Sequence, residues 1–489
     1  MDNELTLQRK RKLELWAQQG NPRYPYAYRE RSPSSQVREA AGKLAPQGVD
    51  RERKFRVAGR LLLLRKVGKN TFAPLRDQSG DLQLHFQADV LGEAEYDRVT
   101  SVLDGGDIVG AEGWASRSKT GEPSLLVEHL DLLTKALAPP PEKWHGVKDP
   151  EFRMRHRYVD LFTSPQVQRT FWARSELTRE LRSVLHREGF LEVETQVLGR
   201  VASGAAARPF EAHYNYLDED FRLRVSLELP LKRLLIGGYE RVFEIGKVFR
   251  NEDMDSMHSP EFTELELYWA FADYEDVRAL VERLLHHLAG KARDLLPGER
   301  TEGLVRSFTP PFARVDFGEA LEKESGISGI LDLPVDRLRT MAREVGAKIT
   351  AETPGGTCLE KLFAHYVEPK LVEPTFVYDH PASTTPLAKT HRSKPGRVER
   401  HELYYRSMEL SNAYSELNDP EDQEQRFRAQ AAAKGDDENF AYDAEYVEAL
   451  RYGMPPAGGL GIGLDRIWMI LLGAESIKDV IIFPPTRSK

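Results

Sequence analysis

The chain has 489 residues, of which 40% are hydrophobic and 30% are charged, as expected for a globular protein of two or three domains. Its single cysteine, Cys358, excludes a disulfide framework and a cysteine-based metal site. No apolar run approaches membrane length, and the opening MDNELTLQRKRK lacks the apolar core of a signal peptide, so we expect a cytoplasmic protein.

Charge is distributed unevenly along the chain. The net charge is −8, yet residues 1–60 carry 14 Lys and Arg against 7 Asp and Glu, which leaves −15 for the remainder. A basic N-terminal region followed by an acidic remainder is typical of a protein that binds a polyanion with one domain. A basic surface helix without that role has the same pattern, so charge alone does not decide between them.

Four regions follow one another along the chain. Residues 1–54 predict a basic helical segment, and residues 55–136 hold five strand-like runs separated by turns, which predict a small OB-type β-barrel. Residues 137–150 include the Pro-rich ALAPPPEKWHG and form a linker. Residues 151–489 form a long mixed domain with helices expected at 167–188 and 272–296, and with a partly helical insertion at about 315–370.

Residues 249–268, FRNEDMDSMHSPEFTELELY, are the most informative segment. The alternating flanks predict two antiparallel strands joined by a long polar loop. Arg250 lies on one strand, and the carboxylates Glu264 and Glu266 lie on the other at period two. This is a plausible cradle for a nucleotide triphosphate beside a cationic group, although an ordinary hairpin with surface charges has the same composition.

Residues 458–470, GGLGIGLDRIWMI, form a second informative segment. Glycines at 458, 459, 461 and 463 are predicted to leave one face of a strand bare, so that a flat group or a backbone can approach. Arg466 begins an apolar run that predicts a helix. The N-terminus of a helix next to glycines is a favourable binding site for phosphate groups. Most Gly-rich runs are turns, but this run together with FRNE is much more specific than either alone.

The two segments resemble motifs 2 and 3 of the class II aminoacyl-tRNA synthetases, and in detail the class II lysyl-tRNA synthetases. Further matches are GAAARPF, LELPLKRLLIGGYERVFEI, PLAKTHRSKPG and NAYSELNDPEDQ, so the resemblance runs from about residue 55 to the end. It implies an α+β protein, with an N-terminal OB-type β-barrel joined to a class II catalytic domain built on an antiparallel β-sheet with flanking helices. It also implies a homodimer with ATP, L-lysine and tRNA(Lys) as substrates.

The resemblance assigns a lysine pocket. Glu228, Glu266 and Glu416 match the glutamates that bind the substrate, and an ammonium group needs such carboxylates with few competing cations nearby. A relative specific for aspartate or asparagine would instead need a cationic residue to bind the side chain of its substrate. The positions that match the rest of the pocket are Gly204, Tyr268, Asn412 and Tyr414.

The resemblance also assigns the ATP site and its metal. Arg250 is expected at the α-phosphate and Arg466 against the adenine or the tail phosphate, and these two are the catalytic residues. Glu402 and Glu409 match carboxylates that hold Mg²⁺, and oxygen ligands suit that ion. Their spacing of seven would place them on opposite faces of a plain strand, so a bulge or bend is required. The remaining ATP-binding positions are Glu252 at the adenine edge, His258 near the phosphates, Phe262 stacked on the ring, and Gly463.

In the barrel, the resemblance assigns anticodon binding to Arg65, Phe72, Gln83 and Glu122. An exposed aromatic ring stacks on unpaired bases, and nearby Arg and Gln side chains read base edges. Without the resemblance, a lone Phe such as Phe72 is more often a core residue.

The implied reaction has two steps. The lysine carboxylate attacks the α-phosphorus of ATP and pyrophosphate leaves, and the terminal 3′-hydroxyl of tRNA then attacks the lysyl-adenylate carbonyl. No side-chain nucleophile is needed, so positioning and charge stabilisation by Arg250 and Mg²⁺ carry the first step.

Three positions depart from the family pattern. Gln196 stands where a proline contributing to the dimer interface is expected, Ser203 replaces a common glycine, and Met257 stands where bacterial relatives carry an arginine that reaches the tail phosphates. Because methionine offers no donor, the last change is expected to weaken ATP binding.

Two alternatives stay open at this point: a lysine-activating paralogue with a non-tRNA acceptor, and a catalytically inactive RNA-binding relative. The intact barrel argues against the first, because a protein acceptor has no anticodon. The retained Arg250, Glu252, Glu402, Glu409 and Arg466 argue against the second.

Overall fold

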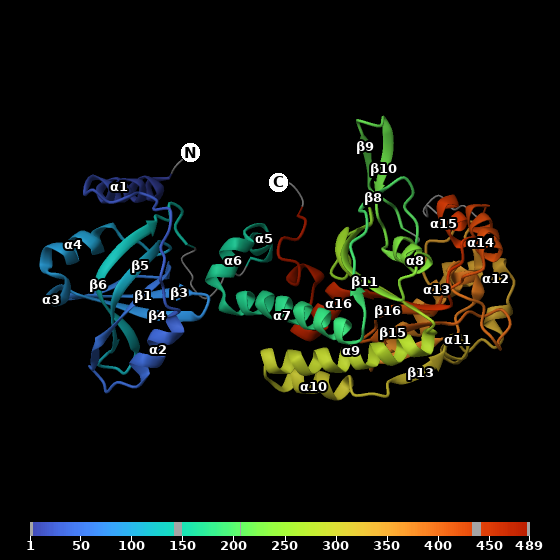
Figure 1. Ribbon diagram of the computed structural model, residues 1–489. Coiled ribbons are helices and arrows are strands. Elements are labelled where there is room, and N and C mark those ends of the chain that lie inside the picture. Colours follow the sequence, from blue (N-terminus) through green and yellow to red (C-terminus); the bar gives the residue numbers. More distant parts are fainter. Residues whose placement is uncertain (1–2, 141–148, 206, 433–441, 487–489) are drawn as a thin grey trace. The chain divides into compact units, whose positions relative to one another are not determined.

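The computed structural model describes residues 3–140, 149–205, 207–432 and 442–486 (Figure 1). The chain forms two compact units, Met1–Pro165 and Gln166–Lys489. Residues 141–148 of the predicted linker lie outside the described residues. Helices α5 (Pro150–Arg155) and α6 (Arg157–Thr163) group with the first unit, because Arg76 donates to the Phe162 carbonyl at 3.1 Å and the Arg60 guanidinium lies 4.4 Å from the Phe162 ring centroid. This division falls later in the chain than the predicted 150/151 boundary.

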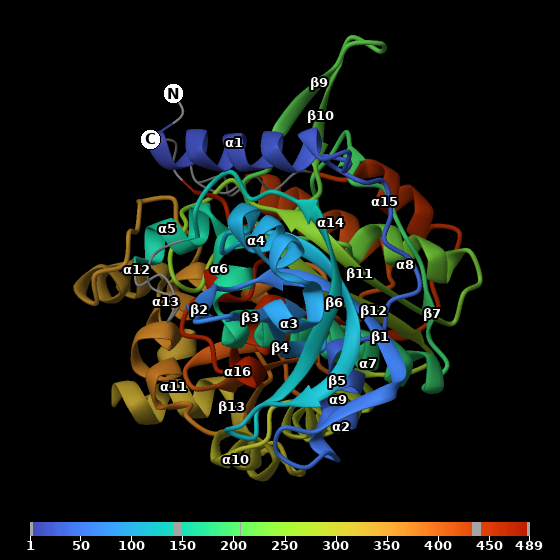
Figure 2. The same ribbon diagram turned by 90° about the vertical axis from the view of Figure 1, so that its left-hand side faces the viewer.

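The first unit contains the predicted barrel, drawn in blue to cyan in Figure 2. Its sheet has the order β1-β5-β6-β4-β3-β2, and the additional β1–β3 pairing, with Leu61 opposite Leu75, closes it. The first predicted strand is split in two, and it begins ahead of residue 55. The strands are β1 (Val49–Leu61), β2 (Arg65–Val67), β3 (Asn70–Asp77), β4 (Gly80–Gln87), β5 (Ile108–Arg117) and β6 (Pro123–Thr134).

The basic N-terminal segment is part of the barrel domain. Leu13 and Trp16 of α1 and Val37 and Ala41 of α2 are buried in the same apolar cluster as the barrel interior. A few apolar residues spaced along charged helices are therefore enough to fix these helices to the barrel. The helices of this unit, besides α5 and α6, are α1 (Glu4–Gln18), α2 (Ser34–Gly42), α3 (Ala88–Leu91) and α4 (Glu93–Val102).

The second unit is built on an eight-stranded sheet with the order β13-β14-β15-β16-β17-β12-β11-β7. All pairs from β14 to β11 are antiparallel, and only the two edge pairs are parallel, which confirms the predicted sheet. The strands are β7 (Leu191–Glu192), β11 (Arg241–Phe249), β12 (Glu261–Ala270), β13 (Ala313–Asp316), β14 (Thr375–Tyr378), β15 (Arg400–Tyr405), β16 (Met408–Ser415) and β17 (Ala457–Gly463).

A separate three-stranded sheet, β8-β10-β9, projects from this unit as a hairpin in Figures 1 and 2. Its strands are β8 (Leu198–Gly199), β9 (Glu211–Tyr214) and β10 (Glu219–Leu223).

Alternation along β12 separates the two faces of the main sheet. Leu265 and Leu267 join the apolar cluster under α7 (Pro165–Arg187), α9 (Tyr274–Leu295), α10 (Glu299–Ser307) and α16 (Leu464–Leu472), whereas Glu264 and Glu266 face the opposite side. Helices α7 and α9 correspond to the two predicted helices. That opposite side is bordered by α8 (Glu228–Ile236), α14 (Pro420–Ala432) and α15 (Ala444–Leu450).

The predicted insertion is helical and has its own apolar cluster, which includes Phe317, Leu338 and Leu362. It contains α11 (Phe317–Ser325), α12 (Val335–Glu344) and α13 (Gly355–Tyr366). In the described part of the chain, no helix combines the length and the apolar character that crossing a membrane requires.

Candidate active site

One face of the main sheet is a trough with a floor of glycine. Gly459, Gly461 and Gly463 alternate along β17 and share this face, as predicted. The prediction is wrong for Gly458, which faces the other way, where a Cβ would meet Val277 of α9. The strand register places Gly461 between Glu266 and Asn412, and Gly459 between Tyr268 and Tyr414.

A cavity of about 780 Å³ opens above this trough. Its lining brings together residues that lie far apart in the sequence, because β11, β12, β16 and β17 are neighbours in the sheet. Glu402 and Glu416 are not among the described residues that line it. The predicted residues that do line it are Gly204, Glu228, Arg250, Glu252, His258, Phe262, Glu266, Tyr268, Glu409, Asn412, Tyr414, Gly463 and Arg466.

Glu266 is held by three donors at one end of the cavity. Its Oε1 accepts hydrogen bonds from Ser226 Oγ and the Leu227 backbone N–H, both at 2.7 Å, and its Oε2 accepts one from the Tyr268 hydroxyl at 2.7 Å. Burial, followed by the nearby Glu264 and Glu228 carboxylates, raises the pKa of Glu266 to about 8 despite these bonds. This carboxyl is therefore fixed in place and ready to release a proton when a cation binds beside it.

Glu228 and Glu416 meet at the closed end of the pocket. The Tyr414 hydroxyl donates to Glu228 Oε1 at 2.5 Å. Glu416 is 1% exposed and lies against the floor, where a Cβ at Gly459 would collide with its Oε1. The expectation of few competing cations is wrong here, because the buried ammonium of Lys232 on α8 contacts both carboxylates.

One side of the cavity carries Arg250 and Phe262. The Arg250 guanidinium lies 5.0 Å from the Phe262 ring centroid, and its Nε donates to the Val225 carbonyl at 3.3 Å. Glu252 is exposed two residues further on, in the loop that joins β11 to β12. An aromatic face beside a guanidinium suits a purine ring that carries phosphates.

The opposite wall is formed by Arg466 near the start of α16. Its two terminal nitrogens donate to the Glu409 carbonyl at 2.9 Å and to His258 Nε2 at 3.1 Å. Because Nε2 accepts, the hydrogen-bond network assigns the His258 proton to Nδ1, which contacts Asp255 at 2.9 Å. The neighbouring Asp465 joins α16 to β12, since it accepts from the Thr263 backbone N–H at 2.7 Å.

Glu264 is a cavity residue to which the sequence analysis gave no role. It stands on β12 between Phe262 and Glu266, and its Oε2 has no hydrogen-bond partner among the described residues. Burial raises its pKa, while Arg250 and Arg466 act in the opposite direction. Its period-two spacing from Glu266 was the signal available in the sequence.

Glu402 and Glu409 are brought together by a hairpin, which explains their odd spacing. They lie on β15 and β16, joined by Arg406 and Ser407 at φ +51° and +63°, and the register shifts beside Leu403. Burial and the Glu402 carboxylate raise the pKa of Glu409 to about 7, as expected for two carboxylates close together.

These two carboxylates fit a magnesium ion that keeps most of its other ligands as water or phosphate oxygens. Glu409 lines the cavity directly. Glu402 is engaged by Arg400 and by the Tyr404 hydroxyl, and Arg400 outweighs the effect of burial and lowers its pKa. No group of three or more metal-ligating side chains occurs in the described ranges.

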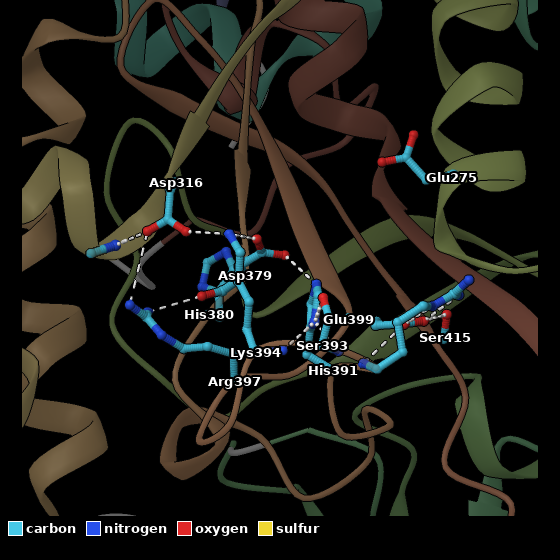
Figure 3. A network of polar contacts seen from close by, with 12 residues as sticks. Glu275, Asp316, Asp379, His380, His391, Ser393, Lys394, Arg397, Glu399 and Ser415 are labelled. Atoms are coloured by element: carbon cyan, nitrogen blue, oxygen red, sulfur yellow. Dashed lines mark hydrogen bonds and ion pairs between the residues drawn. The ribbon is translucent and has the colours of Figure 1, made fainter.

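The PLAKTHRSKPG segment acts as a brace behind the pocket. Figure 3 shows Lys394 between Asp316 and Asp379, at 3.0 and 2.5 Å, and Ser415 donating to Glu399 at 2.7 Å. The backbone of this segment pairs Ala388 with Glu416. The network thereby fixes the strand end from which Glu416 projects.

The structure shows what surrounds the residues that depart from the family pattern. Met257 lines the cavity and packs against the largest apolar cluster, so it offers a thioether where a guanidinium was expected. Ser203 also lines the cavity and donates to Asp443 at 2.9 Å. Gln196 lies in the loop after β7, and nothing in the structure explains it.

The barrel carries the predicted base-binding face. Phe72 alternates with the buried Thr71 and Ala73, so its half-buried ring lies on the outer side of β3, not in the core. The Arg65 guanidinium lies 5.7 Å from the Phe72 ring centroid. The His85 ring stacks on Phe72 at 4.5 Å, a partner that the sequence analysis missed.

Gln83 and Glu122 extend this barrel face. Gln83 lies two residues before His85 on the same side of β4 and donates to Ser124 Oγ at 2.9 Å. Glu122 is exposed in the loop between β5 and β6, where its backbone N–H donates to Ser118 Oγ at 2.9 Å. The four predicted residues therefore come from β2, β3, β4 and the β5–β6 loop of one barrel.

Comparison with known families agrees with both units. Residues 149–487 match the family described as tRNA synthetases class II (D, K and N), and residues 55–133 match the OB-fold nucleic acid binding domain. The first match covers more than half of the chain and defines a class II tRNA synthetase.

Individual relatives show to which branch of this family the chain belongs. The lysine–tRNA ligase of Deinococcus radiodurans is 45% identical over 498 residues, covering 99% of this chain and 94% of the relative. Those of Roseiflexus castenholzii and Moorella thermoacetica are 44% and 42% identical, covering 100% of this chain and 99% of each relative. The chain belongs to the lysine–tRNA ligases.

Proposed function

We propose that this protein activates L-lysine with ATP to form lysyl-adenylate and transfers the lysyl group to the 3′ end of tRNA(Lys). The observation that carries the proposal is a cluster of three carboxylates above the glycine floor. Glu228 and Glu266 line the cavity, and Glu416 is joined to Glu228 through Lys232. Membership of the lysine–tRNA ligases supports the same substrates.

ATP binds across the glycine strand between two cationic walls. Phe262 stacks on the adenine, Glu252 accepts from its edge, and Arg250 contacts the α-phosphate. Arg466 and His258 approach from the other wall, and their mutual bond at 3.1 Å keeps both side chains in place before the nucleotide arrives. Gly463 contributes the absence of a side chain beside Arg466.

Lysine binds with its two ammonium groups among the carboxylates. Glu266 and the cavity edge at Gly204 receive the α-amino end, and the side chain extends between Tyr268 and Tyr414 toward Glu228 and Glu416. Asn412 accepts from Arg400 at 3.1 Å through its Oδ1, which leaves its amide N–H group as a donor to the substrate.

A magnesium ion would be held by Glu409 and Glu402, and it would neutralise phosphate charge as pyrophosphate leaves. The lysine carboxylate attacks the α-phosphorus in line, and Arg250 stabilises the charge that grows on the phosphoryl oxygens. No side chain forms a covalent bond in this scheme.

The barrel binds the anticodon through Phe72, with Arg65, Gln83 and Glu122 reading base edges. A homodimer and a cytoplasmic location are part of the same proposal, since both are implied by the family resemblance.

The proposal is tested by ATP–pyrophosphate exchange with each of the twenty amino acids, with and without tRNA. We expect lysine to be far ahead of all others, and charging of tRNA(Lys) to follow. A preference for aspartate or asparagine would contradict the pocket assignment. Exchange without tRNA charging would favour a paralogue with another acceptor, and no exchange at all would favour an inactive relative.

A further inference from the structure

The closed end of the amino-acid pocket contains a cation of the chain itself. Lys232 is fully buried on α8, one helical turn after Glu228. Its Nζ lies 2.5 Å from Glu228 Oε1 and forms an ion pair with Glu416 Oε2. An isolated buried ammonium would be strongly unfavourable, so these two carboxylates are what stabilises it.

The surroundings of Lys232 allow a substrate ammonium to bind next to it. Lys232 engages one oxygen of each carboxylate, and Glu416 Oε1 has no hydrogen-bond partner among the described residues. The rings of Tyr268 and Tyr414 lie 5.8 and 5.3 Å from Nζ and present aromatic faces to positive charge.

The charges of Lys232 and the three carboxylates around it balance when a ligand with two ammonium groups is present. Glu228, Glu266 and Glu416 carry three negative charges when ionised, and Lys232 supplies one positive charge. The α- and ε-ammonium groups of free lysine supply the other two. A ligand with one ammonium leaves one buried carboxylate without a cation, which is costly.

We propose that Lys232 is a positioning residue for lysine recognition: its ammonium orients the carboxyl groups of Glu228 and Glu416, and the substrate's side-chain ammonium binds the oxygens that Lys232 leaves open. This inference rests on the proposed function and assigns a role to a residue that does not line the cavity.

The charge on Lys232 is consistent with this role. Burial opposes that charge, but Glu228 and Glu416 outweigh burial and raise the pKa of Lys232. Burial raises the pKa of Glu416 well above its usual range, although Lys232 acts in the opposite direction. The other titratable groups that face Lys232 are the tyrosines Tyr268, Tyr414 and Tyr446, which are neutral because burial raises the pKa of each.

The test compares the KM for lysine with the KM for ATP in the full-length protein, measured by lysine-dependent ATP–pyrophosphate exchange. Lys232→Met keeps the length and apolar stem of the side chain and removes its charge. Its effect should be confined to lysine, because the carboxyl groups that receive the substrate's side-chain ammonium lose the group that orients them. The KM for lysine should rise at least about tenfold, and the KM for ATP should stay the same.

Two variants serve as controls. Lys247→Met removes a partly exposed lysine of β11 that pairs with Glu261, and it should leave the KM for lysine unchanged. Lys232→Arg retains the positive charge and should raise the KM for lysine much less than the neutral variants do. Lys232→Gln, which has a donor but no charge, replaces the Met variant if that variant does not fold.

An unchanged KM for lysine in the neutral Lys232 variants, or equal losses for lysine and ATP, would make Lys232 a purely structural residue. A KM for lysine as high in Lys232→Arg as in Lys232→Met would also overturn the inference. Failure of the unaltered protein to bind lysine would instead contradict the proposed function itself, so the two failures are distinguishable.

Discussion

The barrel face and the trough of the main sheet differ in the kind of ligand that each can bind. The barrel presents Phe72 and His85 as stacked rings on a half-exposed surface, and burial lowers the pKa of His85, so the pair is neutral near pH 7. The trough gathers Glu228, Glu266 and Glu416 with Lys232, all of them buried. The first surface suits the flat, uncharged faces of bases, and the second suits a small ligand with two positive charges.

The difference predicts where each region is sensitive. A stacking face of neutral rings tolerates changes of pH, and it fails when the ring is removed. A buried charge cluster depends on every member, because loss of one leaves another without a partner. The following experiments separate the two regions or show that they are coupled.

The largest effect is expected for Arg250→Ala. Charge grows on the α-phosphoryl group as pyrophosphate leaves, so a guanidinium there acts mainly in the transition state. The rate of lysyl-adenylate formation should fall on the order of a hundredfold or more, by analogy with other lost oxyanion donors. Pre-steady-state measurement of adenylate formation checks this, and the ATP dissociation constant should change far less.

Arg250→Lys is the matched variant and should rescue only in part, since a point charge cannot reproduce the planar fork of a guanidinium. Binding of tRNA should be unaffected in both variants. If Arg250→Ala reacts at the normal rate once saturated with ATP, Arg250 only binds the ground state and does not stabilise the transition state.

On the barrel side, Phe72→Ala should weaken tRNA binding by roughly 1–3 kcal/mol through the loss of base stacking. Adenylate formation without tRNA should be nearly unchanged, because the ring contributes nothing to the trough. His85→Ala offers a comparison, since it removes the ring stacked on Phe72 and leaves Phe72 itself in place. Equal damage to tRNA binding and to adenylate formation by Phe72→Ala would mean that Phe72 maintains the fold.

A pH effect of intermediate size is expected in the trough alone. The raised pKa of Glu266, about 8, means that the free protein is protonated there at neutral pH and must release that proton to hold an ammonium. Lysine affinity should therefore increase with pH, by at most about tenfold per unit between about pH 6 and 7.5, where lysine keeps its ammonium groups.

Calorimetric titration with lysine across that range checks the slope, and Glu266→Gln should abolish it because an amide does not titrate. The affinity of the barrel for tRNA anticodon fragments should show no matching slope. A flat lysine affinity in the unaltered protein would place the Glu266 pKa well below 6.

The smallest effect is expected for Met257→Arg. Met257 lines the cavity on the loop that also carries His258, and an arginine there would give the tail phosphates a forked donor. We expect the KM for ATP to fall about threefold to tenfold, with the KM for lysine unchanged. Met257→Leu keeps the apolar contact and should leave both constants unchanged, whereas an equal gain from leucine would attribute the effect to packing.

Sequence patterns predicted the antiparallel sheet because it depends on short-range alternation, whereas the family resemblance supplied the candidate site residues. The period-two spacing of Glu264, Glu266 and Tyr268 was enough to place them on one face. Gly458 was assigned to the wrong face because a glycine has no side chain whose polarity indicates the face of the strand on which it lies. Its orientation follows only from the structure, in which a Cβ at this position would contact Val277.

Lys232 and His85 could not be assigned in advance for a different reason. A lysine in an amphipathic helix is normally solvated, and its burial follows from two glutamates that lie far apart in the sequence. His85 becomes significant only through its cross-strand pairing with Phe72. Long-range pairing of this kind is set by the fold, and it leaves little trace in local composition.

The glycine floor means that the site is defined partly by atoms that are missing. At Gly459, a single added methyl group would strike Glu416 and Tyr268 at once, although it would add no charge and alter no catalytic group. Such a substitution would act as a plug, closing the far end of the trough by bulk alone. We therefore expect only glycine to fit at this position, because the space beside its Cα holds a hydrogen atom and nothing larger.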